Sequence, residues 1–531
     1  MGKNDASRPH KMPYRHLWTT TNLLLFGIWF SIGLVIVLRT VLSTDGMTSG
    51  DGTYYLEAAQ NILIHHQFRI TTLGLGEPLP LDGYDPFTLW PIGYPVLIAG
   101  ISFLTGLPVF WASKLLGWLL AGLSIGGFRR LAGEDAAIMS AMMLFSAPLL
   151  LFSSTFSEAA FLTTLVWFVH WLHQFRQTGE NRALQGILIC ALFLFLLRYV
   201  GIFSGVVLLW LGWRTISENG QKTVPLAVVI FLWTSIIFVY AFWNYARSGA
   251  FSGMNRYAGI TPEVAQIIGS WLKGFMVGFF PLAIDRVSDS LLSLLICIQV
   301  VIFVWVWLAK NKQVDPAQTS SNDRQERLSL AQVLFVTGLC YLVVMTASRW
   351  QHVLWLQKNS FYMELFAPVF WLWIPAIILW IRHQLGWQTQ LKKAVWLTAG
   401  TSFMVYGPLW AVKQVYEQRL PYHQAVAKAI DATKDIPPGS IVLFGDSHLN
   451  YLRPDLIRLE PPSKPLVAKP PTFEETINRL HQAYPTRPFY VFMNTRFNDM
   501  NPDGLVTEEW FHSSFIRRSQ SLPPNTRIRI H

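Results

Sequence analysis

Apolar runs of bilayer length recur along most of this chain, and no other feature limits its fold as strongly. The first run extends from about Thr21 to Leu42. About 20 helical residues cross the ~30 Å hydrocarbon core of a membrane. Only 14% of the 531 residues are charged and 52% are hydrophobic, whereas soluble domains carry about 25% charged residues. The sequence therefore predicts an all-α polytopic membrane protein.

Basic residues indicate which ends of the runs face the cytoplasm, because cytoplasmic loops are rich in Lys and Arg. Four of them precede the first run, which places the N-terminus inside and the next segment outside. Pro91–Thr105 is apolar, but it reaches only about 23 Å and is expected to lie along the membrane or re-enter it. Phe110–Leu131 then ends inside, at Arg129 and Arg130.

Alternation from this point predicts about eleven spans. Their expected ranges are Thr21–Leu42, Phe110–Leu131, Asp135–Phe152, Ala159–Phe175, Ala183–Leu197, Val200–Trp213, Val224–Tyr245, Val287–Leu308, Ser329–Thr346, Phe361–Ile381 and Ala394–Val415.

The chain is expected to divide into three parts. Residues 1–16 form a cytoplasmic N-terminus, and residues 17–415 form the transmembrane domain with a first outer loop at 43–107. Residues 416–531 form a small extracytoplasmic α/β domain. Ile441–Phe444 and Phe489–Phe492 have the length of strands, and Phe473–Tyr484 has helical spacing.

The net charge of +11 does not indicate nucleic-acid binding. Basic cytoplasmic loops account for it, and no basic stripe with interleaved aromatic residues occurs. The cysteines Cys190, Cys297 and Cys340 all lie in apolar segments, where they are expected to act as small buried hydrophobic residues.

The first outer loop carries the strongest candidates for chemistry. Asp51 lies just beyond the first span, and Glu57 follows on a short helix that begins near Thr53. An outward-facing carboxylate at the membrane surface suits a general base that accepts a proton from an acceptor group. Asp is equally favoured as a helix N-cap, and the loop alone leaves both interpretations open.

Other charged residues are expected on the same side of the membrane. The sequence places Ser157-Glu158, Arg198-Tyr199, the stretch from Asn244 to Arg247, and Arg256 there. Ionisable groups beside spanning segments are costly unless they are paired or used. The planar fork of arginine suits phosphate.

The order of these motifs resembles that of the multi-spanning GT-C glycosyltransferases. The most similar are bacterial members related to protein O-mannosyltransferases and lipid A aminoarabinose transferases. The resemblance covers about the first 260 residues. It rests on Asp51-Gly52-x-Tyr54-Tyr55, Trp90-Pro-x-Gly-Tyr94-Pro95, Ser157-Glu158, Arg198-Tyr199-x-Gly201 and Trp243-Asn244-Tyr245.

The resemblance implies sugar transfer from a polyprenyl-phosphate donor to a lipid, glycan or protein acceptor at the outer face of a bacterial inner membrane. Asp51 would be the catalytic base, and Glu158 would orient acceptor or donor. Arg198, Arg247 and Arg256 would contact the donor phosphate. The remaining expected substrate-binding residues are Tyr54, Tyr55, Glu57, Tyr94 and Asn244.

The chain also departs from the resemblance. An Arg-Tyr pair often opens a late span in relatives, but Asn359-Ser360-Phe361-Tyr362 lacks the arginine. The first loop has Asp51-Gly52 where some relatives have Asp-Glu, which weakens the case for a divalent metal. No metal ligand set is assigned, and metal dependence stays open.

Three other readings have less support. A membrane transporter would show internal repeats and broken helices in matching halves, and neither is visible. A non-catalytic scaffold of the same fold is distinguished only by the function of Asp51. Phe444-Gly445-Asp446-Ser447-His448 resembles the nucleophile block of GDSL-type hydrolases, but no Asp-x-x-His follows near the C-terminus.

Overall fold

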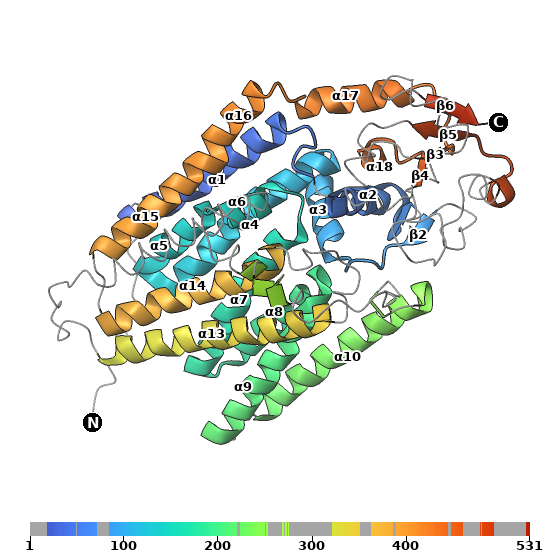
Figure 1. Cartoon of the computed structure of the whole chain (residues 1–531). Coiled ribbons are helices and arrows are strands. Elements are labelled where there is room, and N and C mark those ends of the chain that lie inside the picture. Colours follow the sequence, from blue (N-terminus) through green and yellow to red (C-terminus); the bar gives the residue numbers. More distant parts are fainter. Residues whose placement is uncertain are drawn as a thin grey trace, which may run out of the picture.

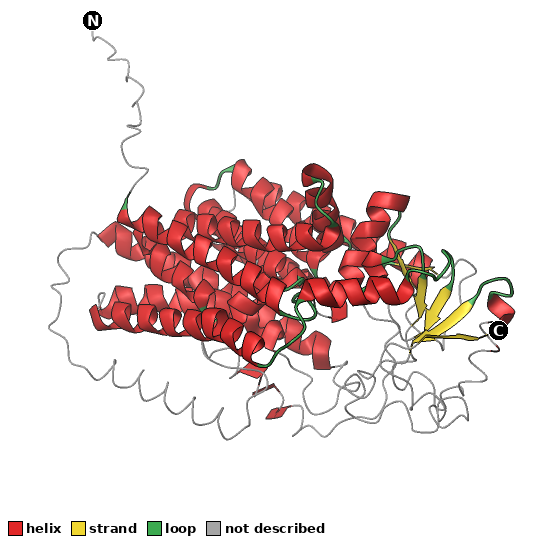
Figure 2. Cartoon of the chain, turned by 90° about the horizontal axis from the view of Figure 1, so that it is seen from above, coloured by secondary structure: helices red, strands yellow, loops and turns green. Residues whose placement is uncertain are grey.

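The structure is a computed structural model. It describes residues 19–48, 50–71, 84–219, 223–249, 251–252, 268–269, 271–272, 274–275, 321–350, 363–385, 389–443, 448–459, 478, 481–492 and 527–530. Helices dominate and lie side by side in a bundle, and the C-terminal strands gather at one end of it (Figures 1 and 2). We call this end, which also holds α2 and the β1–β2 hairpin, the sheet end.

The first part of the chain contains helices of very different lengths. They are α1 (Thr20–Leu42), α2 (Gly50–His65), α3 (Gly93–Thr105), α4 (Val109–Ala132), η2 (Gly133–Asp135), α5 (Ala136–Ala141), η3 (Met142–Leu144), α6 (Ser146–Ser153), α7 (Ser157–Thr178), α8 (Asn181–Leu197), η4 (Tyr199–Ile202), α9 (Phe203–Asn219) and α10 (Thr223–Ser248). The hairpin strands are β1 (Arg69–Thr71) and β2 (Tyr84–Pro86).

The second part begins with three long helices and ends in a sheet. The helices are α13 (Ser321–Trp350), α14 (Met363–Leu385), α15 (Thr389–Met404), the π-helix η8 (Val405–Leu409), α16 (Trp410–Tyr416), α17 (Tyr422–Thr433) and α18 (Leu449–Leu452). The strands are β3 (Ile441–Leu443), β4 (Ile457–Leu459), β5 (Phe489–Phe492) and β6 (Arg527–Ile530).

Several helices have the length and apolarity of membrane spans. Among the described residues five qualify, or six if the bent pair formed by α5–η3 and α6 counts as one. The protein is therefore a multi-pass membrane protein. The total of about eleven spans stays a prediction, and the expected span Val287–Leu308 lies outside the described residues.

Two expected spans are not simple helices. Residues 135–152 were expected to cross in one piece, but the chain bends by 72° between α5–η3 and α6. The last expected span is interrupted by the π-helix η8, which contains Pro408. Proline lacks an N–H and displaces the carbonyl four residues earlier, which explains why the α-helical pattern breaks there.

The short helix α3 agrees with the expectation that Pro91–Thr105 does not span. Its 13 residues reach only about 20 Å. Phe103 and Leu104 at its end are 80% and 79% exposed. Its first residue, Gly93, lies so close to α8 that an added Cβ would be 2.5 Å from the carbonyl oxygen of Leu196. A larger residue at position 93 would push α3 away from the end of α8.

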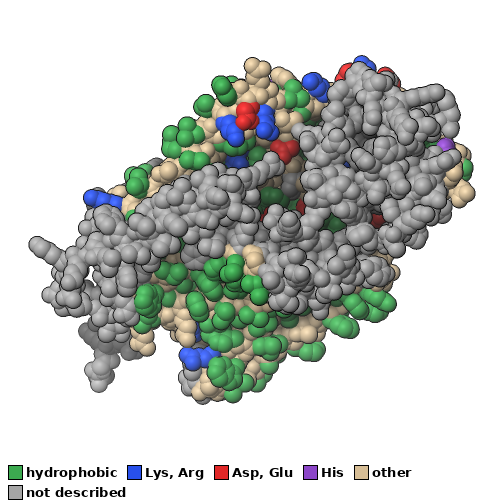
Figure 3. Space-filling model, in the orientation of Figure 1, with side chains coloured by type: hydrophobic (Ala, Val, Ile, Leu, Met, Phe, Trp, Pro, Cys, Tyr) green, Lys and Arg blue, Asp and Glu red, His purple; other side chains and the backbone are tan. Residues whose placement is uncertain are grey.

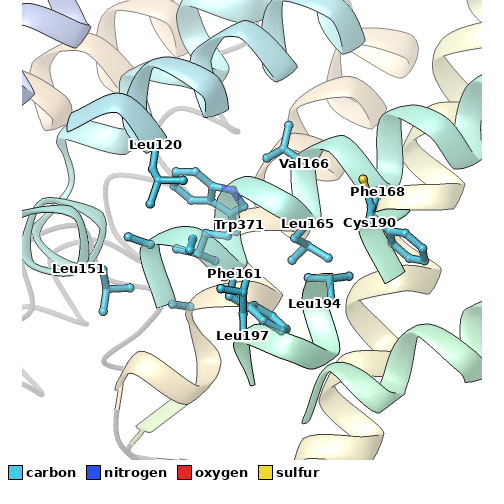
Figure 4. Packing of buried hydrophobic residues seen from close by; sticks show 14 of the residues in the cluster. Leu120, Leu151, Phe161, Leu165, Val166, Phe168, Cys190, Leu194, Leu197 and Trp371 are labelled. Atoms are coloured by element: carbon cyan, nitrogen blue, oxygen red, sulfur yellow. The ribbon is translucent and has the colours of Figure 1, made fainter. Parts of the chain in front are cut away.

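The core lies among α4, α7, α8 and α14. Leu120, Phe161, Leu194 and Trp371 come from these four helices and pack with their neighbours in the interior (Figure 4). Cys190 is also buried in this core, as its sequence context predicted, whereas Cys340 is half-buried. Cys297 lies outside the described residues.

Apolar side chains cover the outside of the bundle as well. Hydrophobic residues spread over α9 and α10, at the bottom of Figure 3. On α10, Phe231, Phe238 and Val239 are each more than 65% exposed. Water would disfavour such a surface, whereas the hydrocarbon of a membrane would not.

The C-terminal sheet has the order β4-β3-β5-β6. Strand β3 pairs in parallel with β4 and β5, and β6 is antiparallel to β5. The strands expected at 441–444 and 489–492 correspond to β3 and β5. Helix α18 follows the carboxyl end of β3 and packs against α2, which brings the sheet to the first loop.

Candidate active site

Helix α2 places Asp51 at the sheet end. The chain leaves α1 at Leu42, turns through Ser43–Thr48, and Asp51 falls in the first turn of α2. Its side chain is exposed, whereas residues 52 to 59 that follow are all buried. A carboxylate at this position interacts favourably with the positive end of the helix dipole.

Aromatic side chains pack around the buried face of α2. Tyr54 stacks on Trp90 with ring centroids 5.5 Å apart. Tyr55 makes edge contacts with Trp90 at 5.6 Å, with Tyr94 at 5.2 Å and with Phe87 at 6.3 Å. The stretch Trp90–Pro95 thus packs against the two tyrosines. Tyr54, Tyr55 and Tyr94 are buried.

The hydroxyl of Tyr55 connects α2 to a buried acidic residue. It lies 3.2 Å from Ser157 Oγ, and Ser157 Oγ donates to Glu158 Oε2 at 3.3 Å. Glu158, in the first turn of α7, forms an ion pair with Arg198. Arg198 is the C-cap residue that directly follows α8. Segments 51–55, 157–158 and 198 therefore meet at the sheet end.

The charges of this cluster act on Tyr55. Burial raises the pKa of the Tyr55 hydroxyl above its ordinary value, and the negative charge of Asp51 raises it further, while Arg198 lowers it. Both Asp51 and Arg198 are therefore close enough to act electrostatically on the same hydroxyl. At neutral pH this tyrosine stays protonated and donates or accepts hydrogen bonds only.

A second chain of hydrogen bonds holds the segment next to Arg198. The Tyr199 hydroxyl donates to the carbonyl oxygen of Thr88 at 2.6 Å, and Asn244 Nδ2 donates to the same hydroxyl at 2.9 Å. Asn244 is fully buried on α10. It therefore links α10 to the first loop through Tyr199.

The β1–β2 hairpin is attached to α2 by polar contacts. Glu57 Oε1 accepts a hydrogen bond from the backbone N–H of Thr71 at 2.6 Å, and Asn61 Nδ2 donates to the Arg69 carbonyl at 2.9 Å. Glu57 is 1% exposed. The sequence suggested that Glu57 binds substrate, and the structure shows that its carboxylate anchors the hairpin.

Beside the hairpin lies an open pocket of about 300 Å³ lined by Gln67, Arg69, Tyr84, Asp85, Pro86 and Arg247. The Arg69 guanidinium lies 4.2 Å from the Tyr84 ring centroid, and that of Arg247 lies 4.8 Å from the Trp243 ring centroid. Arg247 is exposed at the end of α10. Two arginines from distant segments thus face one pocket, together with one carboxylate.

Most of the expected site residues lie at the sheet end, but they do not form one group. Asp51, Tyr55, Glu158 and Arg198 belong to the first cluster, and Arg247 belongs to the pocket. Arg256 lies outside the described residues.

Two further residues were not expected from the sequence. Arg69 was overlooked because it lies in an unremarkable polar stretch. Lys114 was overlooked although a lysine within an apolar span is itself a signal of function.

Within the described part of the chain, no group of three or more His, Cys, Asp and Glu side chains is placed to hold a metal ion. Of the two carboxylates in the first cluster, that of Glu158 is paired with Arg198.

Comparison with known proteins supplies a fold. No protein-family profile matches the chain, and no curated protein sequence does. The oligosaccharyltransferase of Archaeoglobus fulgidus, solved with zinc and sulfate, matches with a TM-score of 0.51 and 11% identity over 92% of this chain and 70% of that one. The chain adopts the GT-C fold.

Other GT-C structures match less closely. ArnT from Cupriavidus metallidurans, bound to undecaprenyl phosphate, gives a TM-score of 0.43 and 14% identity over 92% of this chain and 96% of that one. Arabinosyltransferase EmbB from Mycobacterium smegmatis gives 0.35 and 13% over 85% and 44%. The match to the Archaeoglobus fulgidus structure confirms the GT-C fold expected from the motif order, while the roles of the individual residues are not addressed by any of these matches.

Proposed function

We propose that this protein is a glycosyltransferase that moves a sugar from a polyprenyl-phosphate donor to an acceptor at the extracytoplasmic face of the membrane. The observation that carries the proposal is the contact of α2, which begins with the Asp51 turn, with Ser157 beside the Glu158–Arg198 ion pair at one end of a GT-C bundle. These residues are far apart in sequence, and each lies at a helix end. Folding alone brings them together.

Asp51 is the proposed general base. It is exposed, so an acceptor hydroxyl or amine can reach it. Its carboxylate takes the proton from the acceptor, the acceptor's oxygen or nitrogen bonds to the anomeric carbon, and the bond from that carbon to the phosphate oxygen breaks. Polyprenyl phosphate leaves with the electron pair. A single displacement of this kind inverts the configuration of the sugar.

Arg69 and Arg247 are the proposed contacts of the donor phosphate. Arginine binds phosphate through paired N–H donors, and stacking on Tyr84 and Trp243 restricts both guanidinium groups. Arg198 is engaged with Glu158, which makes it a weaker phosphate contact than the sequence suggested. Positive charge near the leaving phosphate would stabilise the negative charge that develops there.

The outside of the bundle supports a lipid-linked donor. Exposed apolar side chains lie along α10, and Arg247 follows them in the last turn of this helix. A prenyl chain lying along such a surface would keep its phosphate at the sheet end while its hydrocarbon stays in the membrane. A soluble nucleotide sugar would gain nothing from this arrangement.

The test is a transfer assay with the purified, detergent-solubilised protein. A panel of radiolabelled polyprenyl-phosphate sugars is offered with a membrane lipid and glycan extract as acceptor. Wild type is compared with Asp51→Asn and with Glu180→Gln, an exposed acid before α8 at the other end of α7. We expect transfer by wild type and Glu180→Gln, and loss of at least about 100-fold in Asp51→Asn.

Two outcomes would contradict the proposal. Full transfer by folded Asp51→Asn would remove this residue from the mechanism. Absence of transfer by folded wild type from every lipid-linked donor would favour a transporter or a scaffold, which uptake measurements in proteoliposomes would then separate.

A further inference from the structure

Lys114 is a buried basic residue that the proposed reaction does not use. It lies in the second turn of α4, and the residue is only 4% exposed. Burying a lysine amino group is costly unless its N–H groups find acceptors. Nζ of Lys114 lies 2.8 Å from the Met47 carbonyl oxygen, 3.0 Å from Thr155 Oγ1 and 3.3 Å from the Ser153 carbonyl oxygen.

Two of these acceptors, Met47 and Thr155, belong to the loops that precede the acidic residues of the site, and Ser153 is the last residue of α6. Met47 lies four residues before Asp51, and Thr155 lies three residues before Glu158. The backbone N–H of Thr155 also donates to the Met47 carbonyl at 3.1 Å. The Met47 carbonyl oxygen is therefore shared by one donor from α4 and one from the segment before α7.

The turn that presents this carbonyl is held in an unfavourable backbone conformation. Met47 has φ of 55°, in the left-handed region, and Gly46 before it has φ of 59°. For a residue with a side chain this conformation is sparsely populated and persists only where surrounding contacts impose it. The N–H of Met47 donates to Ser43 Oγ at 2.8 Å and to Asp45 Oδ1 at 3.0 Å, while Lys114 and Thr155 hold its carbonyl.

We infer that Lys114 is a positioning residue, which sets the distance between the Asp51 loop and the Glu158 loop. One nitrogen atom, mounted on the well-packed helix α4, holds backbone and side-chain oxygens of both loops. If Lys114 is removed, each loop keeps its own helix but loses the shared anchor. A shift of about 1 Å between groups that act on one substrate costs up to about 100-fold in rate.

This inference rests on the proposed function for its kinetic part only. The variant is Lys114→Met, which keeps the length of the side chain and removes the donors. We expect kcat to fall by about 10- to 100-fold. The KM for the polyprenyl-phosphate sugar should change by less than about threefold, because Lys114 does not line the pocket that contains Arg69 and Arg247. Lys413→Met, at an exposed lysine of α16, is the matched control.

Hydrogen exchange supplies a measurement that needs no activity. In Lys114→Met, amide exchange should rise at least about tenfold in residues 43–48 and 154–156 and stay unchanged in α4, α7 and α8. A role in overall stability alone would instead speed exchange throughout the bundle and leave kcat per folded molecule at the wild-type value.

A second pair of variants decides the matter if Lys114→Met does not fold. Thr155→Val removes the hydroxyl that Lys114 contacts. Ser113→Ala keeps that hydroxyl and Lys114, and removes the 3.0 Å contact of Ser113 Oγ with Thr155 Oγ1 and its 2.7 Å hydrogen bond to the Phe110 carbonyl. Thr155→Val is expected to lower kcat by about two- to tenfold, and Ser113→Ala to stay near wild type. Wild-type kcat and unchanged exchange of both loops in Lys114→Met or in Thr155→Val would overturn the inference. If wild type shows no transfer, exchange alone decides it.

Discussion

Arg198, the C-cap residue that follows α8, forms an ion pair with Glu158 in the first turn of α7. The Glu158 side chain is 6% exposed and that of Arg198 is 21% exposed. These two oppositely charged residues are distant in the sequence, and the packing of α7 against α8 holds them together. The pair therefore ties the start of α7 to the residue that follows α8.

Glu158→Gln is expected to destabilise the protein, because it leaves the arginine without its charged partner. Breaking a fully buried pair costs about 3–5 kcal/mol, and the exposure of Arg198 should reduce this to about 1–3 kcal/mol. Thermal unfolding in detergent measures the change. The double variant Glu158→Gln/Arg198→Met should lose less stability than the sum of the two single variants, and a strictly additive result would contradict an energetic coupling between the two residues.

Arg69→Ala and Arg247→Ala should each weaken binding of the lipid-linked donor. A hydrogen bond to a charged group contributes about 1.5–3 kcal/mol, so the KM for the donor should rise about tenfold or more while the fold is kept. Arg182→Ala, at an exposed arginine near the start of α8, is the control. An unchanged KM in both pocket variants would show that the phosphate binds elsewhere.

Gly46→Ala should disturb the contact between the first loop and the C-terminal region. A Cβ at Gly46 would lie 2.6 Å from the rings of Phe110 and Tyr422, and φ there is 59°. Phe110 and Tyr422 are themselves stacked with centroids 4.0 Å apart. We expect a loss of about 1–3 kcal/mol from the strain, seen as a lower melting temperature.

Gly100→Ala in α3 is the matched control for this change. No atom lies within 4 Å of a Cβ placed there, and alanine favours a helix over glycine by about 0.5–1 kcal/mol. Its melting temperature should equal or exceed that of wild type. Equal melting temperatures for the Gly46 and Gly100 variants would mean that the turn adapts without cost.

Asp455→Asn should change how the C-terminal region responds to acid. The guanidinium of Arg453 donates hydrogen bonds to both carboxylate oxygens of Asp455, at 2.8 and 2.7 Å, and to the carbonyl oxygen of Ile436 at 3.0 Å. Hydrogen bonds from Arg453 hold the pKa of the Asp455 carboxyl below its usual value. Because the pKa of this carboxyl is lower in the folded protein than in the unfolded chain, its ionised form stabilises the fold at pH values above the unfolded-state pKa of about 3.9. This stabilisation is lost as the pH falls through the folded-state pKa.

The measurement is amide exchange of residues 433–436 at pH 6 and near pH 3. Asp455→Asn should exchange faster than wild type at pH 6, after correction for intrinsic rates, and the difference should shrink near pH 3. A difference that stays constant with pH would show that the carboxylate charge does not hold this segment.

The sequence predicted the membrane class, the order of most helices and the GT-C fold, because these depend on local composition and on motifs read in order. Apolar length alone identifies α1, α4 and α10 as spans. It did not reveal the 72° bend after η3 or the π-helix at Pro408. Breaks of this kind depend on the packing of neighbouring helices as much as on the residues within them.

For the site, the sequence by itself determined the candidates, and tertiary structure decided their partners. Asp51, Glu158 and Arg198 stood out because charges next to apolar spans are costly unless used. Glu57 stood out as the second carboxylate of the first outer loop, yet it anchors the hairpin through the Thr71 N–H. The neighbours of Lys114, Arg69 and Arg247 come from segments that are distant in the sequence and meet only in the folded protein. Long-range contacts of this kind produce no periodic pattern or fixed motif spacing in a single sequence. The packing of the whole bundle determines which helix ends meet.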